Sequence, residues 1–176
     1  MSNLYYIGLV PDEALSTLSV NYKNHAEELF ASVAAKKSPA HITLVPPFKA
    51  TAEQLEQINL KLGEIAADND KLELNVIGWN HFKERTIYMA IEATPALKNI
   101  FNLVFDQMAD IVKPHGEKKF IPHISIINRD LPEGQFSVAF NFFNTLELPS
   151  ACTCGKLVLF SLVNGKWRNS ISYSLN

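Results

Sequence analysis

Residues 40–47 read Ala-His-Ile-Thr-Leu-Val-Pro-Pro, and residues 120–127 read Phe-Ile-Pro-His-Ile-Ser-Ile-Ile. Both stretches are rich in apolar and β-branched residues, so each predicts a β-strand. In each, a histidine precedes a hydroxyl residue by two positions: His41 precedes Thr43, and His123 precedes Ser125. Because side chains alternate between the two faces of a strand, each imidazole shares a face with its hydroxyl. The aliphatic neighbours then point into a core.

The rest of the chain alternates between strand and helix patterns. Asp12 is a good N-cap, Thr51 to Gln54 fits a loose capping box, and Asn164-Gly165 is a strong hairpin signal. Pro46-Pro47 is expected to end the first histidine strand. Further strands are expected at about 4–10, 72–79, 85–92, 156–163 and 167–174, and helices at about 12–35, 51–65, 95–112 and 133–143.

These patterns predict an α+β fold. The order strand, helix, histidine strand, helix occurs once in full and again less cleanly, which is a weak internal repeat. We therefore expect residues 1–176 to form a single bilobal domain. Its two similar lobes would each have an antiparallel-rich sheet with helices outside, and the active-site groove would lie between them.

Composition narrows the class of ligand and the cellular setting. The chain has 176 residues, 47% of them hydrophobic, and a formal net charge of −2. It is not basic enough to bind duplex nucleic acid, so a nucleic-acid ligand would be short or held at one end. Cys152 and Cys154 are expected to be reduced packing thiols, because two positions in one strand suit a disulfide poorly. We expect a cytoplasmic monomer with no membrane segment.

Two imidazoles and two hydroxyls on facing strands suit phosphodiester chemistry. Cleavage needs a base for the attacking oxygen and an acid for the leaving oxygen, and histidine titrates near neutrality. Hydroxyl donors can stabilise the charge that develops on the non-bridging oxygens. Neither step needs a metal or another cofactor.

His41-Ile42-Thr43-Leu44 and His123-Ile124-Ser125-Ile126 resemble the paired H-x-[ST]-x signatures of the two-histidine (2H) phosphoesterase superfamily, which includes 2′-5′ RNA ligase and cyclic phosphodiesterases. The resemblance extends over nearly the whole chain. It implies a bilobal α+β fold and metal-independent cleavage of 2′,3′-cyclic or 2′-5′ phosphodiesters in nucleotides or short RNA. It also implies that His41 and His123 are catalytic and that Thr43 and Ser125 hold the phosphate.

Other residues are candidates for substrate contacts. Phe48 and Trp167 could stack on a base, although packing is the commoner role of such aromatics. Arg129, Lys118 and Lys119 could contact a terminal phosphate. Family members often carry a basic residue just after the second motif, and here Asn128 precedes Arg129, so Arg129 would be shifted from that position.

Two other functions remain open at this stage. The chain could be a nucleotide- or RNA-end-binding module with little or no turnover. It could also be a metallohydrolase with histidine ligands, but no Asp or Glu stands at motif spacing beside either histidine. The sequence does not identify which histidine is the base, nor the natural substrate.

Overall fold

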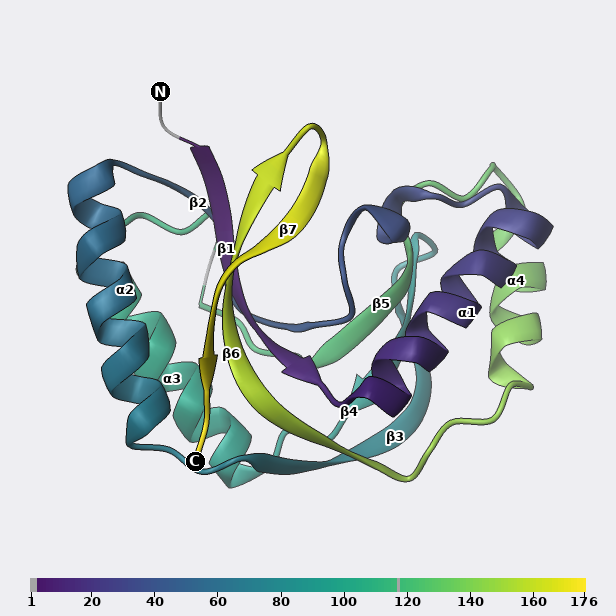
Figure 1. The fold of residues 1–176 in the computed structure, drawn as a ribbon. Helices are drawn as coiled ribbons and strands as arrows, with labels where there is room; N and C mark the ends of the chain where they lie inside the picture. Colours follow the sequence, from purple (N-terminus) through teal and green to yellow (C-terminus); the bar gives the residue numbers. More distant parts are fainter. Residues whose placement is uncertain (1–2, 117) are drawn as a thin grey trace.

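A computed structural model describes residues 3–116 and 118–176. The described residues form one seven-stranded antiparallel sheet with helices on both of its sides (Figure 1). The strands are β1 (Asn3–Pro11), β2 (Ile42–Ala50), β3 (Leu72–Phe82), β4 (Thr86–Ile91), β5 (His123–Asn128), β6 (Ala151–Val163) and β7 (Lys166–Ser174). The helices are α1 (Glu13–Phe30), α2 (Ala52–Ala67), α3 (Pro95–Ala109) and α4 (Phe136–Asn144), with a 3₁₀ turn at Ala34–Lys37.

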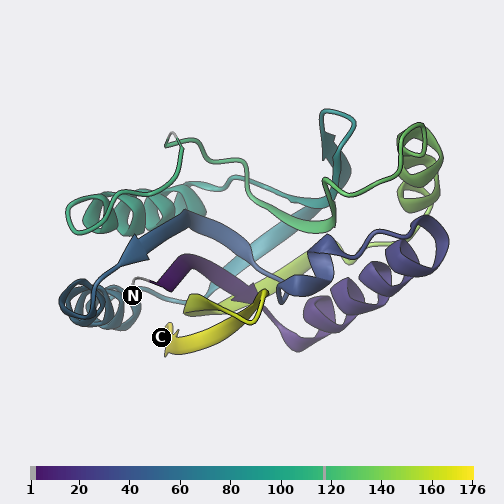
Figure 2. The same ribbon diagram turned by 90° about the horizontal axis from the view of Figure 1, so that it is seen from above.

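Strand β3 joins the two halves of the sheet. The sheet order is β2-β1-β6-β3-β4-β5, and β7 pairs with β6 outside this path. The first part of β3 pairs with β6, from Leu72 opposite Cys154 to Asn75 opposite Ala151. From Val76 onward, β3 pairs with β4 instead. This switch lets the sheet curl until its two end strands, β2 and β5, approach each other (Figure 2).

The helices flank the curled sheet in two pairs. Helices α2 and α3 lie together on one side, whereas α1 and α4 lie on the other (Figures 1 and 2). Each of the first three helices has a side-chain N-cap: Asp12 for α1, Thr51 for α2 and Thr94 for α3. Thr51 and Gln54 form the expected capping box, with both reciprocal bonds present. In the described part of the chain, no helix is both long and apolar enough to cross a membrane.

The expected α+β class and most expected elements are confirmed, but some boundaries were wrong. Helix α1 stops at Phe30 because Ala31 adopts the left-handed conformation at its C-terminus. Strand β2 continues through Pro46 and Pro47 to Ala50. An edge strand tolerates proline because only one of its sides carries ladder hydrogen bonds, and β2 is the end strand of this sheet.

The C-terminal hairpin and the two cysteines agree with expectation. Asn164 and Gly165 join β6 to β7, both with positive φ (49° and 73°), as a type I′ turn requires. Strand β6 begins earlier than expected because residues 151–154 pair with β3. Cys152 and Cys154 lie in this early part, and both are buried free thiols.

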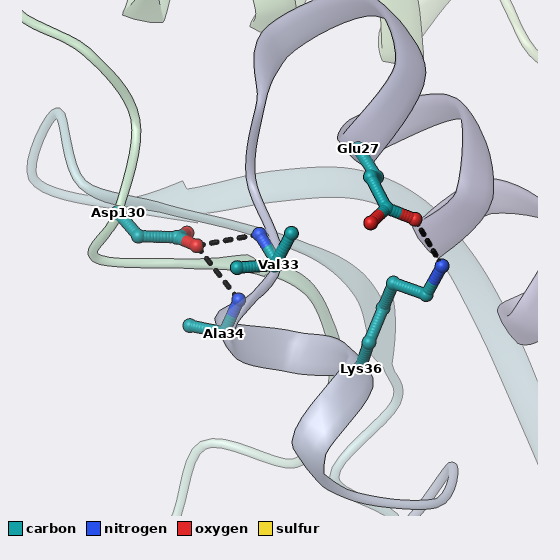
Figure 3. Close-up of polar contacts among 5 residues, drawn as sticks. All are labelled: Glu27, Val33, Ala34, Lys36 and Asp130. Carbon is teal, nitrogen blue, oxygen red and sulfur yellow. Dashed lines mark hydrogen bonds and ion pairs between the residues drawn. The ribbon is translucent and has the colours of Figure 1, made fainter.

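One carboxylate ties the end of β5 to the chain that enters β2. Asp130 Oδ1 accepts a hydrogen bond from Ser32 Oγ at 2.6 Å. Its Oδ2 accepts from the backbone N–H groups of Val33 at 2.6 Å and Ala34 at 2.7 Å. Figure 3 shows the two backbone bonds beside the nearby Lys36–Glu27 ion pair. Asp130 therefore joins the segment after His123 to the segment before His41.

Replacing Asp130 with alanine should lower the free energy of unfolding by about 2–3 kcal/mol, because hydrogen bonds to a charged acceptor contribute more than neutral ones. The matched control is Glu27→Ala, which removes an exposed ion pair next to the same turn. That control should cost less than about 1 kcal/mol. Urea unfolding followed by circular dichroism measures both, and equal losses would contradict a special role for Asp130.

Candidate active site

A groove of about 780 Å³ lies where β2 and β5 approach each other. Both histidines and both hydroxyl residues line it: His41, Thr43, His123 and Ser125. His41 directly precedes β2, and His123 is the first residue of β5. The strand alternation that was expected from the sequence explains the arrangement, because Ile42 and Ile124 are buried on the opposite face. Two histidine–hydroxyl pairs from distant parts of the chain therefore line one groove.

The two imidazoles are held in the same way. His41 Nδ1 lies 2.8 Å from the carbonyl oxygen of Pro39, and His123 Nδ1 lies 2.6 Å from that of Ile121. A carbonyl oxygen can only accept, so Nδ1 carries the proton in each neutral ring. Each Nε2 is then left with a free lone pair. Within residues 3–116 and 118–176, neither Nε2 has a hydrogen-bond partner in the protein. Neither Nε2 is among the fully buried polar atoms that lack a partner. Both Nε2 atoms are thus available to accept a proton, and both histidines line the groove.

Aromatic rings flank each histidine. The ring of His41 lies 4.6 Å from Tyr6 and 5.5 Å from Phe160 between ring centroids. The ring of His123 lies 4.9 Å from Phe82 and 4.8 Å from Tyr88. Tyr6 and Tyr88 belong to β1 and β4, the strands that pair with β2 and β5. Packing on neighbouring strands therefore fixes the plane of both imidazoles.

His41 has a further polar network behind it. The hydroxyl of Tyr6 lies 3.2 Å from His41 Nδ1 and 2.6 Å from Ser38 Oγ. Lys23 Nζ donates to the carbonyl oxygen of Ser38 at 2.9 Å. This brings a buried cation close to His41.

Burial lowers the pKa of both histidines. The pKa of His41 falls to about 4, mainly by desolvation, while the Pro39 carbonyl opposes the shift and the charges of Lys23 and His123 add to it. Desolvation also lowers the pKa of His123, and the Ile121 carbonyl opposes it. Both imidazoles are consequently neutral at pH 7 when no anion is bound.

The remaining predicted contacts divide into two groups. Arg129 and Trp167 line the groove, and so does Lys119, whereas Lys118 pairs with Asp106 instead. The prediction for Phe48 was wrong. Its side chain is 0% exposed in the core and stacks on Tyr5, so it is not available to a base.

Sequence reasoning missed several residues that shape the groove. They are Gly8, Tyr6, Lys23, Ser38, Phe82 and Tyr88. A Cβ on Gly8 would lie 2.9 Å from the backbone oxygen of Ile42 and 3.5 Å from His41 Cβ, so glycine lets β1 approach the histidine closely. The only signal was the single glycine inside an apolar strand pattern. The others carried no local signal, because their role depends on which strands become neighbours.

No group of three or more His, Cys, Asp or Glu residues is arranged to hold a metal ion within the part of the chain that the structure describes.

Comparison with known proteins gives a consistent result. Residues 11–166 match the sequence profile of the 2′-5′ RNA ligase superfamily. A provisionally named phosphoesterase from Geobacillus sp. strain WCH70 is 26% identical over 166 residues, covering 93% of this chain and 91% of the relative. A similarly named protein from Bacillus licheniformis is 22% identical, with 93% of each chain covered.

Solved structures share the fold. The crystal structure of Escherichia coli LigT complexed with 3′-AMP superposes with a TM-score of 0.70 and 16% identity, covering 100% of this chain and 99% of LigT. LigT complexed with ATP superposes with a TM-score of 0.68, again at 16% identity and with 100% and 99% covered.

Gly8→Ala should damage the groove, because the added Cβ meets backbone that cannot move as a flexible side chain could. We expect a loss of about 1–3 kcal/mol in unfolding free energy. The matched control is Gly63→Ala in α2, where the nearest atom is 3.9 Å away, on the Tyr173 ring. That change should be neutral or stabilising by about 0.5–1 kcal/mol, because alanine favours helix. Thermal unfolding of both variants measures these changes. An unchanged stability of Gly8→Ala would contradict the inference that β1 needs glycine to approach His41.

Histidine titration should follow the direction of the pKa shifts. By NMR, the rings of His41 and His123 should titrate below 6.5, with His41 the lower. The unfolded chain binds more protons than the folded one between about pH 4 and pH 6.5, so stability is full above this window and falls as the pH drops through it. His41→Gln should reduce that fall in urea unfolding. A His41 pKa above 6.5 would contradict the assigned environment.

Proposed function

This chain belongs to the 2′-5′ RNA ligase superfamily, and from that premise we propose that it cleaves or reversibly forms phosphodiester bonds of the 2′,3′-cyclic or 2′-5′ type. The observation that supports this most directly is the pair of histidines that line one groove, each with its Nδ1 held by a carbonyl and its Nε2 without a partner among the described residues. The proposed substrates are nucleotides or short RNA ends. The proposed chemistry is acid–base catalysis by His41 and His123 without a metal.

The first step uses a neutral imidazole as the base. Its Nε2 takes a proton from the attacking oxygen, which is water in the hydrolysis of a cyclic phosphate. The Nδ1–H bond to the carbonyl supports the ring as it becomes positive, because the carbonyl oxygen stabilises the imidazolium. A neutral ring at pH 7 is what the lowered pKa values provide.

The second step needs a protonated imidazole to give its proton to the leaving 2′ or 3′ oxygen. The substrate promotes this protonation, because a phosphate anion in the groove favours a positive charge on one of the two rings. As the oxygen leaves, the P–O bond breaks and the product carries a 2′- or 3′-phosphate. Running the same steps backward, with exchanged roles, forms the bond.

In this mechanism Thr43 and Ser125 would hold the non-bridging oxygens. Each hydroxyl lies on the same strand face as its histidine, and both line the groove. Donors fixed before the reaction stabilise the developing charge without reorganising. Arg129 also lines the groove and would add positive charge there.

Nucleotide binding by proteins of this fold supports the substrate class. LigT, which shares the fold, has been crystallised with 3′-AMP and with ATP. The competing function, a binding module with little turnover, uses the same groove, so only turnover separates the two.

His41→Ala and His123→Ala should each reduce the hydrolysis of adenosine 2′,3′-cyclic phosphate about 10²–10⁴-fold, because each removes one proton-transfer group. The assay contains EDTA, and chromatography of the product reports a 2′- or 3′-phosphate. The matched control is His81→Ala, because His81 has a similar Nδ1–carbonyl bond, to Lys83, but does not line the groove.

Full turnover in either groove variant, or a strict need for added divalent metal, would overturn the mechanism. Tight binding of adenosine 2′-phosphate without any turnover by the wild type would favour the binding module.

A further inference from the structure

A second, smaller pocket of about 230 Å³ adjoins the groove on the His41 side. Five residues line both hollows: Lys23, Lys37, Ser38, Pro39 and Trp167. The small pocket is completed by residues from α1, the 3₁₀ turn and the β6–β7 hairpin, namely Val20, Asn24, Lys36, Lys166 and Arg168. A ligand that reaches His41 can therefore extend into this pocket without leaving the surface.

The lining of this pocket is basic. It contains Lys23, Lys36, Lys37, Lys166 and Arg168, and no Asp or Glu. Lys36 pairs with Glu27. Across residues 3–116 and 118–176, the other four cations form no ion pair. A concave site with unpaired cations and no acidic residue is suited to an anion.

Lys23 shows that the site is built rather than incidental. Its side chain belongs to a residue only 4% exposed, and its one described hydrogen bond is to the carbonyl oxygen of Ser38. A buried ammonium without a counterion is costly, because desolvation disfavours its charge. Burial accordingly lowers the pKa of Lys23 to about 8. An anion bound beside it would supply the missing charge.

We propose that this pocket, which we call the basic subsite, binds a second phosphate of the substrate, one carried at the 5′ position of the nucleoside whose 2′,3′-phosphate reacts. The proposal rests on the proposed function and extends it to the substrate class. Trp167 lies on the border of the two hollows, where its ring packs edge-on against Tyr6 with centroids 4.7 Å apart. It would contact the sugar or base that connects the two phosphates.

This assignment separates two kinds of substrate. A cyclic nucleoside monophosphate fills the groove alone, whereas a 5′-phosphorylated nucleotide or an RNA end fills both sites. The 5′ phosphate of a 5′-phosphorylated nucleotide is a monoester, and the phosphate at the same position of an RNA end is a diester. Both present anionic oxygens to Lys and Arg, which bind either form.

The test compares three substrates: adenosine 2′,3′-cyclic phosphate, its 5′-phosphorylated form, and the dinucleotide ApA with a terminal 2′,3′-cyclic phosphate. For the wild type, kcat/KM should rise about tenfold or more when a 5′ phosphate is present. The double variant Lys166→Gln/Arg168→Gln should lose most of this gain but keep its rate on the monophosphate, because neither residue lines the groove.

The matched control is Lys98→Gln, an exposed residue of α3 that lines none of these sites. It removes the same type of charge and should keep the gain. A gain with only one of the phosphorylated substrates identifies the form that the site accepts. No gain with either, or a gain that the double variant keeps, would overturn the proposal while leaving the two-histidine reaction intact.

A binding measurement keeps the two proposals distinguishable. By calorimetry, adenosine 2′,5′-bisphosphate should bind the wild type about tenfold more tightly than adenosine 2′-phosphate, and the double variant should not discriminate. This readout needs no turnover. Failure of the cyclic substrates to react would therefore refute the reaction, and equal affinity for the two ligands would refute the basic subsite.

Discussion

The carboxylate of Asp130 is the contact on which the geometry of the groove most depends. The histidines lie at the starts of the two end strands of the sheet, and these two strands are not hydrogen-bonded to each other. Something must therefore hold them at a set separation. Asp130, seven residues beyond His123, accepts three hydrogen bonds from Ser32, Val33 and Ala34, at the start of the 3₁₀ turn that leads to His41. Backbone donors cannot change rotamer, so this link is stiffer than a pair of side chains would be.

With the strands held, the two halves of the groove are constructed alike. Each histidine donates from Nδ1 to the carbonyl two residues earlier, and each lies against a tyrosine and a phenylalanine. The two halves differ in the polar and charged groups that lie behind each histidine. His41 has Tyr6, Ser38 and the buried Lys23 behind it, while the described contact of His123 Nδ1 is with Ile121 alone. The buried Lys23 thus lies behind His41, and the basic subsite opens from that same half.

Local sequence signals predicted an element correctly wherever the signal depended only on residues next to each other in the chain. The capping box at Thr51 and the Asn164-Gly165 turn occur as expected, because their side-chain and backbone requirements involve only adjacent residues. Pro46 and Pro47 misled, because a proline ends a central strand but not an edge strand, and edge position is a property of the sheet. The prediction for Phe48 failed for a related reason. The side chain is buried against Tyr5 of β1, and the sequence does not show that β1 lies beside β2.

The sequence by itself determined the class of fold, the strands that carry His41 and His123, and the sharing of a face by each histidine and its hydroxyl residue. These follow from hydrophobic periodicity and strand alternation, which act over a few residues. Only the tertiary structure decided that the two strands meet, that Gly8 admits the ring of His41, that Asp130 ties the halves together, and that Lys23 is buried without a counterion. Those features join residues from different elements, and local pattern carries no information about which elements become neighbours when β3 switches partners and the sheet curls.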